Sequence, residues 1–255
     1  MKTLNSYFNN IYCINLDRRT DRWEECLIEF KKHSLDVERF SAIDGKDLKS
    51  LPGLNSGQVG AIYSHMGVIQ KAKESNLDNV LILEDDVKFD DDLNLKFSKI
   101  YNRIPNDWDI ILFGGNHSGN NPWSKGTLSR VDENVFRVTN SLALHCYVVR
   151  NTVYDMSIEV LSKMNNTNDA LFAEIQSKVN CYIIRPHLAW QRPSYSDLCG
   201  MYSDHIALYD DKALFEGRFF GEESFKRDDI YDKLDPTWKS FWDNQRKKRN
   251  NYGGN

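Results

Sequence analysis

The 255-residue chain is poor in cysteine, has no long apolar run and carries no strong excess of charge of one sign. Its five cysteines are scattered and never form a Cys-x-x-Cys pair, which argues against a disulfide framework or a zinc site. Cys13, Cys146 and Cys181 lie in apolar stretches typical of buried, reduced thiols. A net charge of -4 and a pI near 5.9 do not indicate a nucleic-acid partner.

The absence of certain segments also predicts where the protein resides. No apolar segment reaches the length of a membrane-spanning helix, and the polar opening residues do not resemble a signal peptide. We therefore expect a soluble, cytoplasmic protein. Near the C-terminus, the aromatic residues 238–242 precede a basic run at 246–249. This tail suits either peripheral contact with an anionic membrane or a docked terminal helix with a solvated basic end.

Apolar runs and helical periodicities alternate along residues 1–190, which predicts an α/β core with a mostly parallel sheet. Residues 191–255 lack clear periodicity, so we interpret them as a C-terminal extension that wraps the core within a single domain. The polar segment 117–133 is interpreted as a long functional loop or lid. Strands are expected at 11–16, 37–43, 79–84, 108–113 and 181–185, and an antiparallel pair at 135–139 and 142–149.

Helices are expected to begin near residues 20, 55, 93, 152 and 168. Thr20 or Asp21 can cap the first of them. Asn55, followed three residues later by Gln58, predicts a capping box for the second.

The most informative motif is Glu84-Asp85-Asp86, which directly follows the apolar residues 80–83. The acids therefore sit at the carboxyl end of a buried strand, where ligands bind in open α/β sheets. Side-chain alternation predicts that Glu84 and Asp86 face one way and Asp85 the other. Adjacent carboxylates favour a compensating cation, and oxygen ligands prefer Mg²⁺ or Mn²⁺. The alternative is a solvated acidic turn that closes a strand.

Four motifs follow one another along the chain. They are Ile14-Asn15-Leu16-Asp17-Arg18-Arg19 with Arg22, Phe40-Ser41-Ala42-Ile43-Asp44-Gly45, Gly57-Gln58-Val59-Gly60 with Ser64-His65, and Leu83-Glu84-Asp85-Asp86-Val87. Their order and spacing resemble glycosyltransferase family 25, which includes lipopolysaccharide sugar transferases and collagen hydroxylysine galactosyltransferases. The resemblance covers roughly residues 11–197. It implies a GT-A type, Rossmann-like twisted sheet with helices on both faces, a UDP-sugar donor, Mn²⁺ or Mg²⁺, and inversion at the anomeric carbon.

Under this resemblance, Glu84 and Asp86 are the expected metal ligands. Asp197 is the preferred third ligand, with His187 and His205 as alternatives. A divalent cation held there would stabilise the negative charge that develops on the departing diphosphate.

The resemblance also implies a donor-binding set around the first strand. Arg18, Arg19 or Arg22 is expected to contact phosphate, because guanidinium matches phosphate geometrically, although these arginines can equally pair with Asp17 and Asp21. His65 can be a half-buried structural histidine instead of a donor contact. Gly57 and Gly60 suit either close ligand approach or close packing. The donor-binding residues are Asn15, Leu16, Asp17, Arg18, Arg19, Ser64, His65, Asp85 and Asn116.

Inversion needs a base that takes the proton of the acceptor hydroxyl, and Asp169 is the preferred residue. Its position at the start of a predicted helix also fits a simple interaction with the helix dipole, and Glu174 is a substitute one turn later. The sequence thus predicts a metal-dependent transferase that moves galactose or glucose to a hydroxyl on a glycan, a lipid-linked saccharide or a hydroxylysine-containing protein. The alternatives are a non-catalytic nucleotide-sugar-binding module and a Mg²⁺-dependent phosphohydrolase.

Overall fold

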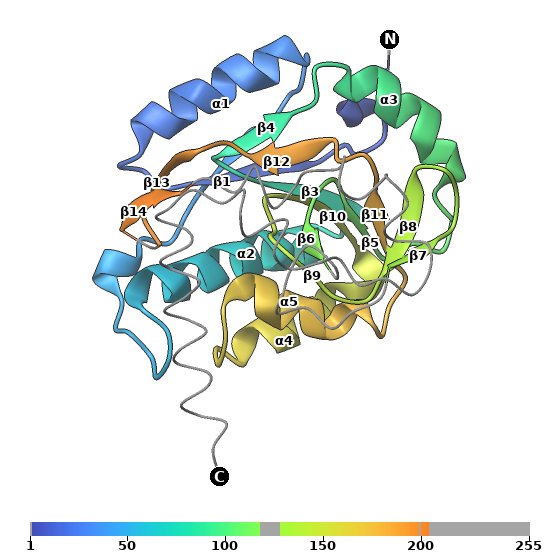
Figure 1. Cartoon of the computed structure of the whole chain (residues 1–255). Coiled ribbons are helices and arrows are strands. Elements are labelled where there is room, and N and C mark those ends of the chain that lie inside the picture. Colours follow the sequence, from blue (N-terminus) through green and yellow to red (C-terminus); the bar gives the residue numbers. More distant parts are fainter. Residues whose placement is uncertain (1, 118–127, 199, 204–255) are drawn as a thin grey trace, which may run out of the picture.

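An eight-stranded mixed sheet forms the centre of the protein, in the order β2-β1-β3-β10-β5-β11-β8-β7 (Figure 1). The computed structural model describes residues 2–117, 128–198 and 200–203. Strands β2, β1, β3, β5, β11 and β7 run in one direction, and β10 and β8 run in the other. The strands of this sheet are β1 (Ile11–Asn15), β2 (Glu38–Ser41), β3 (Asn79–Glu84), β5 (Ile110–Leu112), β7 (Leu128–Arg130), β8 (Val135–Val138), β10 (Cys146–Arg150) and β11 (Cys181–Ile184).

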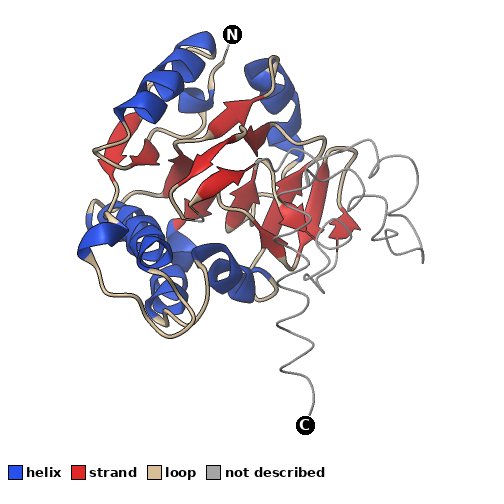
Figure 2. Cartoon of the chain, turned by 60° about the vertical axis from the view of Figure 1, so that its left-hand side comes forward, coloured by secondary structure: helices blue, strands red, loops and turns tan. Residues whose placement is uncertain are grey.

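Helices cover both faces of this sheet, which confirms the predicted α/β class (Figures 1 and 2). Helices α1 and α3 lie on one face, and α2, α4 and α5 lie on the other. The five helices are α1 (Thr20–Lys32), α2 (Ser56–Glu74), α3 (Leu93–Ile100), α4 (Tyr154–Ser162) and α5 (Asn168–Gln176).

Strand alternation divides the core into two layers. In β3, Val80 and Ile82 pack toward α2, whereas Leu81 and Leu83 pack toward α1 and α3. All four side chains are fully buried, and burial of each contributes roughly 1.5–3 kcal/mol. This two-sided burial explains why the sequence shows a continuous apolar run here.

Helix starts show where local sequence rules succeed. Asn55 and Gln58 form the predicted reciprocal capping box at the start of α2. The predicted cap of α1 is wrong, because Thr20 is already helical and the N-cap residue Arg19 makes no side-chain capping bond.

Close packing fixes the position of α2, since a Cβ on Gly60 would lie 2.6 Å from the Ile43 carbonyl oxygen. Gly60 therefore serves close packing.

The predicted antiparallel pair of residues 135–139 and 142–149 is wrong. Strand β8 pairs with β11 and β7, while β10 lies between β3 and β5. The short connection between them holds β9 (Ser141–Leu142), which pairs with β6 (Asn116–His117). Ala143 then adopts a left-handed conformation with φ 71°. The connection thus turns the chain into the middle of the sheet before β10 begins.

Four further short strands lie outside the main sheet. β12 (Ala189–Gln191) pairs with β4 (Val87–Phe89), and β13 (Ser194–Ser196) pairs with β14 (Met201–Ser203). The predicted loop at 117–133 is replaced in part by β7, and its residues 118–127 lie outside the described part of the chain. The basic tail, His205 and most of the predicted extension also lie outside it. None of the helices in the described ranges is long and apolar enough to cross a membrane.

The parallel strands place three loops at one edge of the sheet. β1 pairs with β2 on one side and β3 on the other, both in parallel. Ile14 is in register with Glu84, and Asn15 with Ser41. The loops that follow β1 and β2 therefore lie beside the acidic turn that follows β3.

Candidate functional site

The acidic motif, Glu84-Asp85-Asp86, occupies the end of β3 and the turn before β4. Glu84 ends the strand, whereas Asp85 and Asp86 belong to the turn. Asp85 is buried with 7% of its surface exposed. The orientation expected from the sequence, Glu84 and Asp86 on one side and Asp85 on the other, assumed that the strand continues through Asp86, whereas the strand ends at Glu84.

Arg22 compensates two of these carboxylates. Its Nη1 lies 2.8 Å from Asp85 Oδ1, and its Nη2 lies 2.8 Å from Asp86 Oδ2. The Nη2 also donates to Ser194 Oγ at 3.2 Å. Arg22 is only 9% exposed, and its guanidinium pairs with the acidic turn. The acids expected to pair with Arg22 were Asp17 and Asp21, so this contact was not predicted, and a phosphate contact of Arg22 stays a prediction.

Asp85 is held from a second side by the first strand. The Asn15 Nδ2 donates to Asp85 Oδ2 at 2.7 Å, and the Arg39 Nε donates to Asn15 Oδ1 at 2.8 Å. The pKa of Asp85 is raised to about 6, chiefly by burial and also by the charges of Asp86 and Glu84, while Arg22 and Asn15 oppose the increase. Asn15 is 1% exposed, so it orients the acidic turn from inside the protein.

Glu84 has different partners. The His65 Nε2 lies 3.1 Å from Glu84 Oε1, and the Gln191 Nε2 donates to Glu84 Oε2 at 3.2 Å. The Glu84 side chain is 24% exposed. Glu84 is therefore partly exposed at the site, while His65 and Gln191 orient its two carboxylate oxygens.

Ser64 and His65 do not present their side chains at a surface. Ser64 is 1% exposed, donates to the Gly60 carbonyl and accepts from the Ile43 amide. His65 is 2% exposed and contacts Glu84. The geometry thus favours the structural reading that the sequence left open. Ser64 fixes the loop after β2 to α2, and His65 acts on Glu84.

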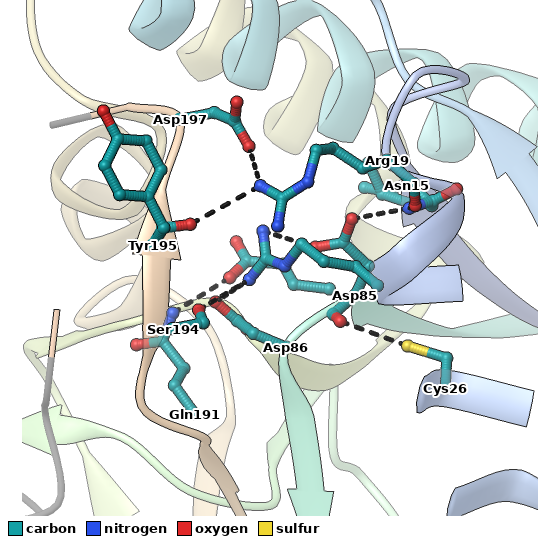
Figure 3. Close-up of polar contacts among 12 residues, drawn as sticks. Asn15, Arg19, Cys26, Asp85, Asp86, Gln191, Ser194, Tyr195 and Asp197 are labelled. Atoms are coloured by element: carbon teal, nitrogen blue, oxygen red, sulfur yellow. Dashed lines mark hydrogen bonds and ion pairs between the residues drawn. The ribbon is translucent and has the colours of Figure 1, made fainter. Parts of the chain in front are cut away.

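Two arginines of the first loop close on Asp197. The Arg19 Nη1 pairs with Asp197 Oδ2 (Figure 3). The Arg18 Nη1 donates to Asp197 Oδ1 at 2.7 Å. Burial acts to raise the pKa of Asp197, but the hydrogen bonds from these arginines hold it below its usual range. Each arginine also pairs with a second acid. The Arg18 Nε lies 2.9 Å from Asp44 Oδ2, and the Arg19 Nη2 lies 2.8 Å from Asp21 Oδ2. The pairing of Arg19 with Asp21 is thus one of the ion pairs expected from the sequence.

The segment 191–198 lies across the acidic turn as a strap. The Arg192 Nη2 donates to the Asp85 carbonyl at 2.7 Å, and the Arg192 amide donates to the Asp86 carbonyl at 2.8 Å. At the far end the Asn55 Nδ2 donates to the Leu198 carbonyl at 3.0 Å. Gly57 lies beneath the strap, since a Cβ there would be 3.5 Å from the Asp197 carbonyl oxygen. The strap joins the acidic turn to the first loop.

The residues beside β9 form the other side of the site. Asn116 pairs with Leu142, and its buried Oδ1 accepts no hydrogen bond within the described residues. Ala143, which follows Leu142, donates its backbone amide hydrogen to Asp169 Oδ2 at 3.3 Å. Two residues later, the His145 carbonyl accepts the Glu84 amide at 3.0 Å. This short segment therefore connects Asn116, Asp169 and Glu84.

Asp169 lies in the first turn of α5. Its Oδ1 accepts from the Thr167 hydroxyl at 2.6 Å and from the Ala170 amide at 2.8 Å. These contacts orient the carboxylate and also suit an acid at a helix start. The substitute base, Glu174, pairs with Lys163 at 2.7 Å on the surface.

The oxygen, nitrogen and sulfur donors of the site limit where a metal ion can bind. Across residues 2–117, 128–198 and 200–203, no three His, Cys, Asp or Glu side chains are grouped to hold one ion. Asp197 instead contacts arginines, and His187 is 3% exposed with its Nε2 3.0 Å from Arg185 Nη1. Asp86 Oδ1, however, is a buried acceptor with no hydrogen-bond partner in the described chain. Glu84 and Asp86 therefore fit an ion that takes its remaining ligands from water and phosphate.

Four other residues of the site were missed by sequence reasoning. Tyr147, Gln191, Arg192 and Ser194 reach it from distant parts of the chain. No pattern in the local sequence around these residues predicts these contacts. Of the other donor candidates, Asp17 is exposed and pairs with Arg39 at 2.8 Å. Leu16 contributes its carbonyl to the Arg19 amide at 2.9 Å.

Comparison with known proteins identifies similar sequences. The family model described as "Glycosyltransferase family 25 (LPS biosynthesis protein)" matches residues 8–168. A "Glycosyltransferase 25 family member" of Aedes aegypti is 32% identical over 127 residues, covering 42% of this chain and 21% of that protein. "Procollagen galactosyltransferase 2" of Homo sapiens is 30% identical over 129 residues, again covering 42% of this chain and 21% of the relative. The matched region is thus about one fifth of each relative's length.

Among solved structures, one similar chain is titled "crystal structure of a glycosyltransferase involved in the glycosylation of the major capsid of PBCV-1". It has a TM-score of 0.38 and 12% identity, and the match covers 62% of this chain and 67% of that chain. A TM-score this low supports no functional inference. The family match on residues 8–168 includes the first loop, Ser64-His65, the acidic motif and Asn116, and it ends just before Asp169.

Proposed function

The chain belongs to glycosyltransferase family 25, and on this premise we propose a metal-dependent inverting transfer of a hexose from a UDP-sugar to a hydroxyl acceptor. The sugar is galactose or glucose, and the acceptor is a glycan, a lipid-linked saccharide or a hydroxylysine-containing protein. One observation carries the metal-dependent part of this proposal. Asp86 Oδ1 is a buried carboxylate oxygen without a hydrogen-bond partner among the described residues, and it lies in the same turn as Glu84.

Glu84 and Asp86 would hold the cation, Mn²⁺ or Mg²⁺, and the protein environment of these two residues supports that role. His65 and Gln191 orient Glu84, while Arg22 orients Asp86 through its Oδ2 and leaves its Oδ1 available. When bound, the cation acts as a Lewis acid that stabilises charge on the diphosphate. Two carboxylates with substrate phosphate are a common arrangement for such hard ions.

Arg18 and Arg19 provide the remaining positive charge near the donor. Both now pair with the Asp197 carboxylate, an anion that resembles one phosphate group in charge and in its paired oxygens. Guanidinium groups bind carboxylate and phosphate in the same geometry. The diphosphate of the donor would therefore compete with Asp197 for these arginines.

Asp169 is the proposed base. As the acceptor oxygen forms its bond to the anomeric carbon, the bond from that carbon to the diphosphate oxygen breaks, and the acceptor proton passes to the Asp169 carboxylate. The Thr167 hydroxyl and the Ala170 amide direct Oδ1, and Ala143 contacts Oδ2. These contacts hold the carboxylate on the side of the site that borders β9.

The decisive experiment compares UDP-galactose and UDP-glucose turnover with Mn²⁺ and with chelator. We expect Mn²⁺ to stimulate the wild type and Asp86→Ala to lose that stimulation. Asp91→Ala is the matched control, because Asp91 is an exposed acid on the same stretch and pairs with Lys32 at the surface. Equal UDP affinity in Mn²⁺ and in chelator would contradict the metal assignment. UDP-sugar binding with no turnover of any donor would favour the binding-module alternative, and release of inorganic phosphate the phosphohydrolase.

A further inference from the structure

Three side chains from separate elements form a line that ends at the acidic motif. The Tyr147 hydroxyl on β10 lies 2.9 Å from His65 Nδ1 on α2, and His65 Nε2 lies 3.1 Å from Glu84 Oε1 at the end of β3. Tyr147 is 0% exposed and His65 is 2% exposed. The line therefore runs through the protein interior and reaches the site only at Glu84.

Sheet geometry explains why these groups meet. Tyr147 is in register with Ile82 across the antiparallel pair of β10 and β3. Side chains two residues apart on a strand share a face, so Ile82 and Glu84 both lie on the α2 side of the sheet. His65 lies in α2, which packs on that face. The juxtaposition is thus fixed by backbone pairing and helix packing together.

Ring contacts restrict the rotation of both aromatic groups. The His65 and Tyr147 rings are stacked with centroids 5.8 Å apart and an interplanar angle of 25°. Phe172 of α5 packs edge-on against Tyr147, with centroids 5.2 Å apart. This helix also carries Asp169. The line is therefore supported by the element that bears the proposed base.

The direction of the hydrogen bonds along this line, from donor to acceptor, follows from the burial of Tyr147. Burial raises the pKa of the Tyr147 phenol well above its usual range, so the hydroxyl keeps its proton. If His65 is neutral, the Tyr147 hydroxyl donates to Nδ1 and the ring proton resides on Nε2. If His65 is protonated, Nε2 carries a proton as well. In both cases His65 donates an N–H to Glu84, and the tautomer with a bare Nε2 against the carboxylate is disfavoured.

We propose that His65 and Tyr147 are positioning residues that fix the orientation of Glu84 for binding a divalent cation together with the donor diphosphate. This inference rests on the proposed function. Oε1 of Glu84 accepts from His65 and Oε2 accepts from Gln191, so the carboxylate plane is set before any ligand arrives. Groups that orient a metal ligand without touching the metal typically affect metal affinity by about 10–100-fold.

Tyr147→Phe is the sharpest test, because it removes one oxygen and leaves the ring. Tyr154→Phe is the matched control. The Tyr154 hydroxyl is also buried but has no hydrogen-bond partner in the described part of the chain. The measurement is Mn²⁺ affinity in the presence of UDP, followed by electron paramagnetic resonance of free Mn²⁺. We expect about 10-fold weaker Mn²⁺ binding in Tyr147→Phe and no change in Tyr154→Phe.

His65 variants provide an independent readout. His65→Gln retains an N–H group of similar reach, whereas His65→Leu removes it. We expect His65→Gln to retain part of the Mn²⁺ affinity that His65→Leu loses. UDP affinity measured in EDTA should be the same for the wild type and all variants, since the proposed role concerns only Glu84 and the cation.

The outcomes separate this inference from the proposed function. If the wild type binds Mn²⁺ with UDP but Tyr147→Phe matches Tyr154→Phe, the positioning role is wrong and the proposed function stands. Equal Mn²⁺ affinity in the two His65 variants would also overturn it. If the wild type binds no Mn²⁺ with UDP, the metal-dependent function itself fails and the inference fails with it.

Discussion

Replacing Arg22 with methionine is the most direct test of how the acidic motif is stabilised. The guanidinium lies 2.8 Å from one oxygen of Asp85 and 2.8 Å from one oxygen of Asp86. The exposed fractions of the three side chains are only 10%, 10% and 16%. Arg22→Met therefore leaves two adjacent, largely buried carboxylates without their shared cation.

The size of the loss follows from this burial. Removing one partner of a buried ion pair typically costs about 3–5 kcal/mol, because the remaining charge is left uncompensated. Such a loss leaves a domain folded if its stability lies in the middle or upper part of the usual range of about 5–15 kcal/mol. Arg103→Met is the control, since Arg103 pairs with Asp132 and Glu133 at an exposed position where water screens the charges.

The loss should also depend on pH. The folded pKa of Asp85 is already raised to about 6, and Arg22 opposes that rise. Without Arg22 the folded pKa rises further. The folded state then holds the proton more tightly than the unfolded state, so stability present at low pH is lost as pH rises through the folded pKa. Each further unit adds about 1.4 kcal/mol to the penalty at neutral pH.

The assay is urea unfolding in EDTA at about pH 5 and about pH 7.5, where Asp85 of the wild type is largely protonated and largely ionised respectively. We expect Arg22→Met to lose more free energy of unfolding at the higher pH, and Arg22→Met with Asp86→Asn to recover part of it. The reasoning is refuted if Arg22→Met costs no more than Arg103→Met. It is also refuted if the two pH values give the same loss.

Three other variants test separate parts of the site. Asp169→Asn should reduce kcat by at least about 100-fold in steady-state kinetics, because the amide cannot take the acceptor proton. Donor affinity should be nearly unchanged. Unchanged transfer would remove Asp169 from the mechanism. Asp197→Asn should tighten UDP binding measured calorimetrically in EDTA, since the competing carboxylate is gone; if Asp197 is instead a metal ligand, Mn²⁺ stimulation of turnover falls. Gly60→Ala should lower the free energy of unfolding by about 1–3 kcal/mol in urea, because its Cβ would lie 2.6 Å from the Ile43 carbonyl oxygen. Wild-type stability in that variant would show that α2 can move away from the loop.

Much of the fold follows from local patterns. The continuous apolar run of β3 predicts a strand buried on both faces, and the reciprocal pairing of Asn55 and Gln58 predicts the start of α2. These signals are local, so a single stretch of sequence carries each of them.

The strand order required the tertiary structure. Strands β8 and β10 are close in sequence but pair with different neighbours, since β10 enters the sheet between β3 and β5. Proximity along the chain favours a hairpin, but packing against both layers of helices decides the partner. The left-handed backbone at Ala143, which turns the chain there, has no glycine to signal it.

By itself, the sequence determined the class of fold, the strand that bears the acidic motif and the family to which the chain belongs. Each of these depends on residue types at fixed spacing along the chain. Only the tertiary structure decided that Arg22 neutralises Asp85 and Asp86, that Asp197 pairs with arginines, and that Tyr147 and His65 lie behind Glu84. Such charge and hydrogen-bond partners are chosen by distance in space, and residues far apart in the sequence become neighbours only when the sheet and its helices pack.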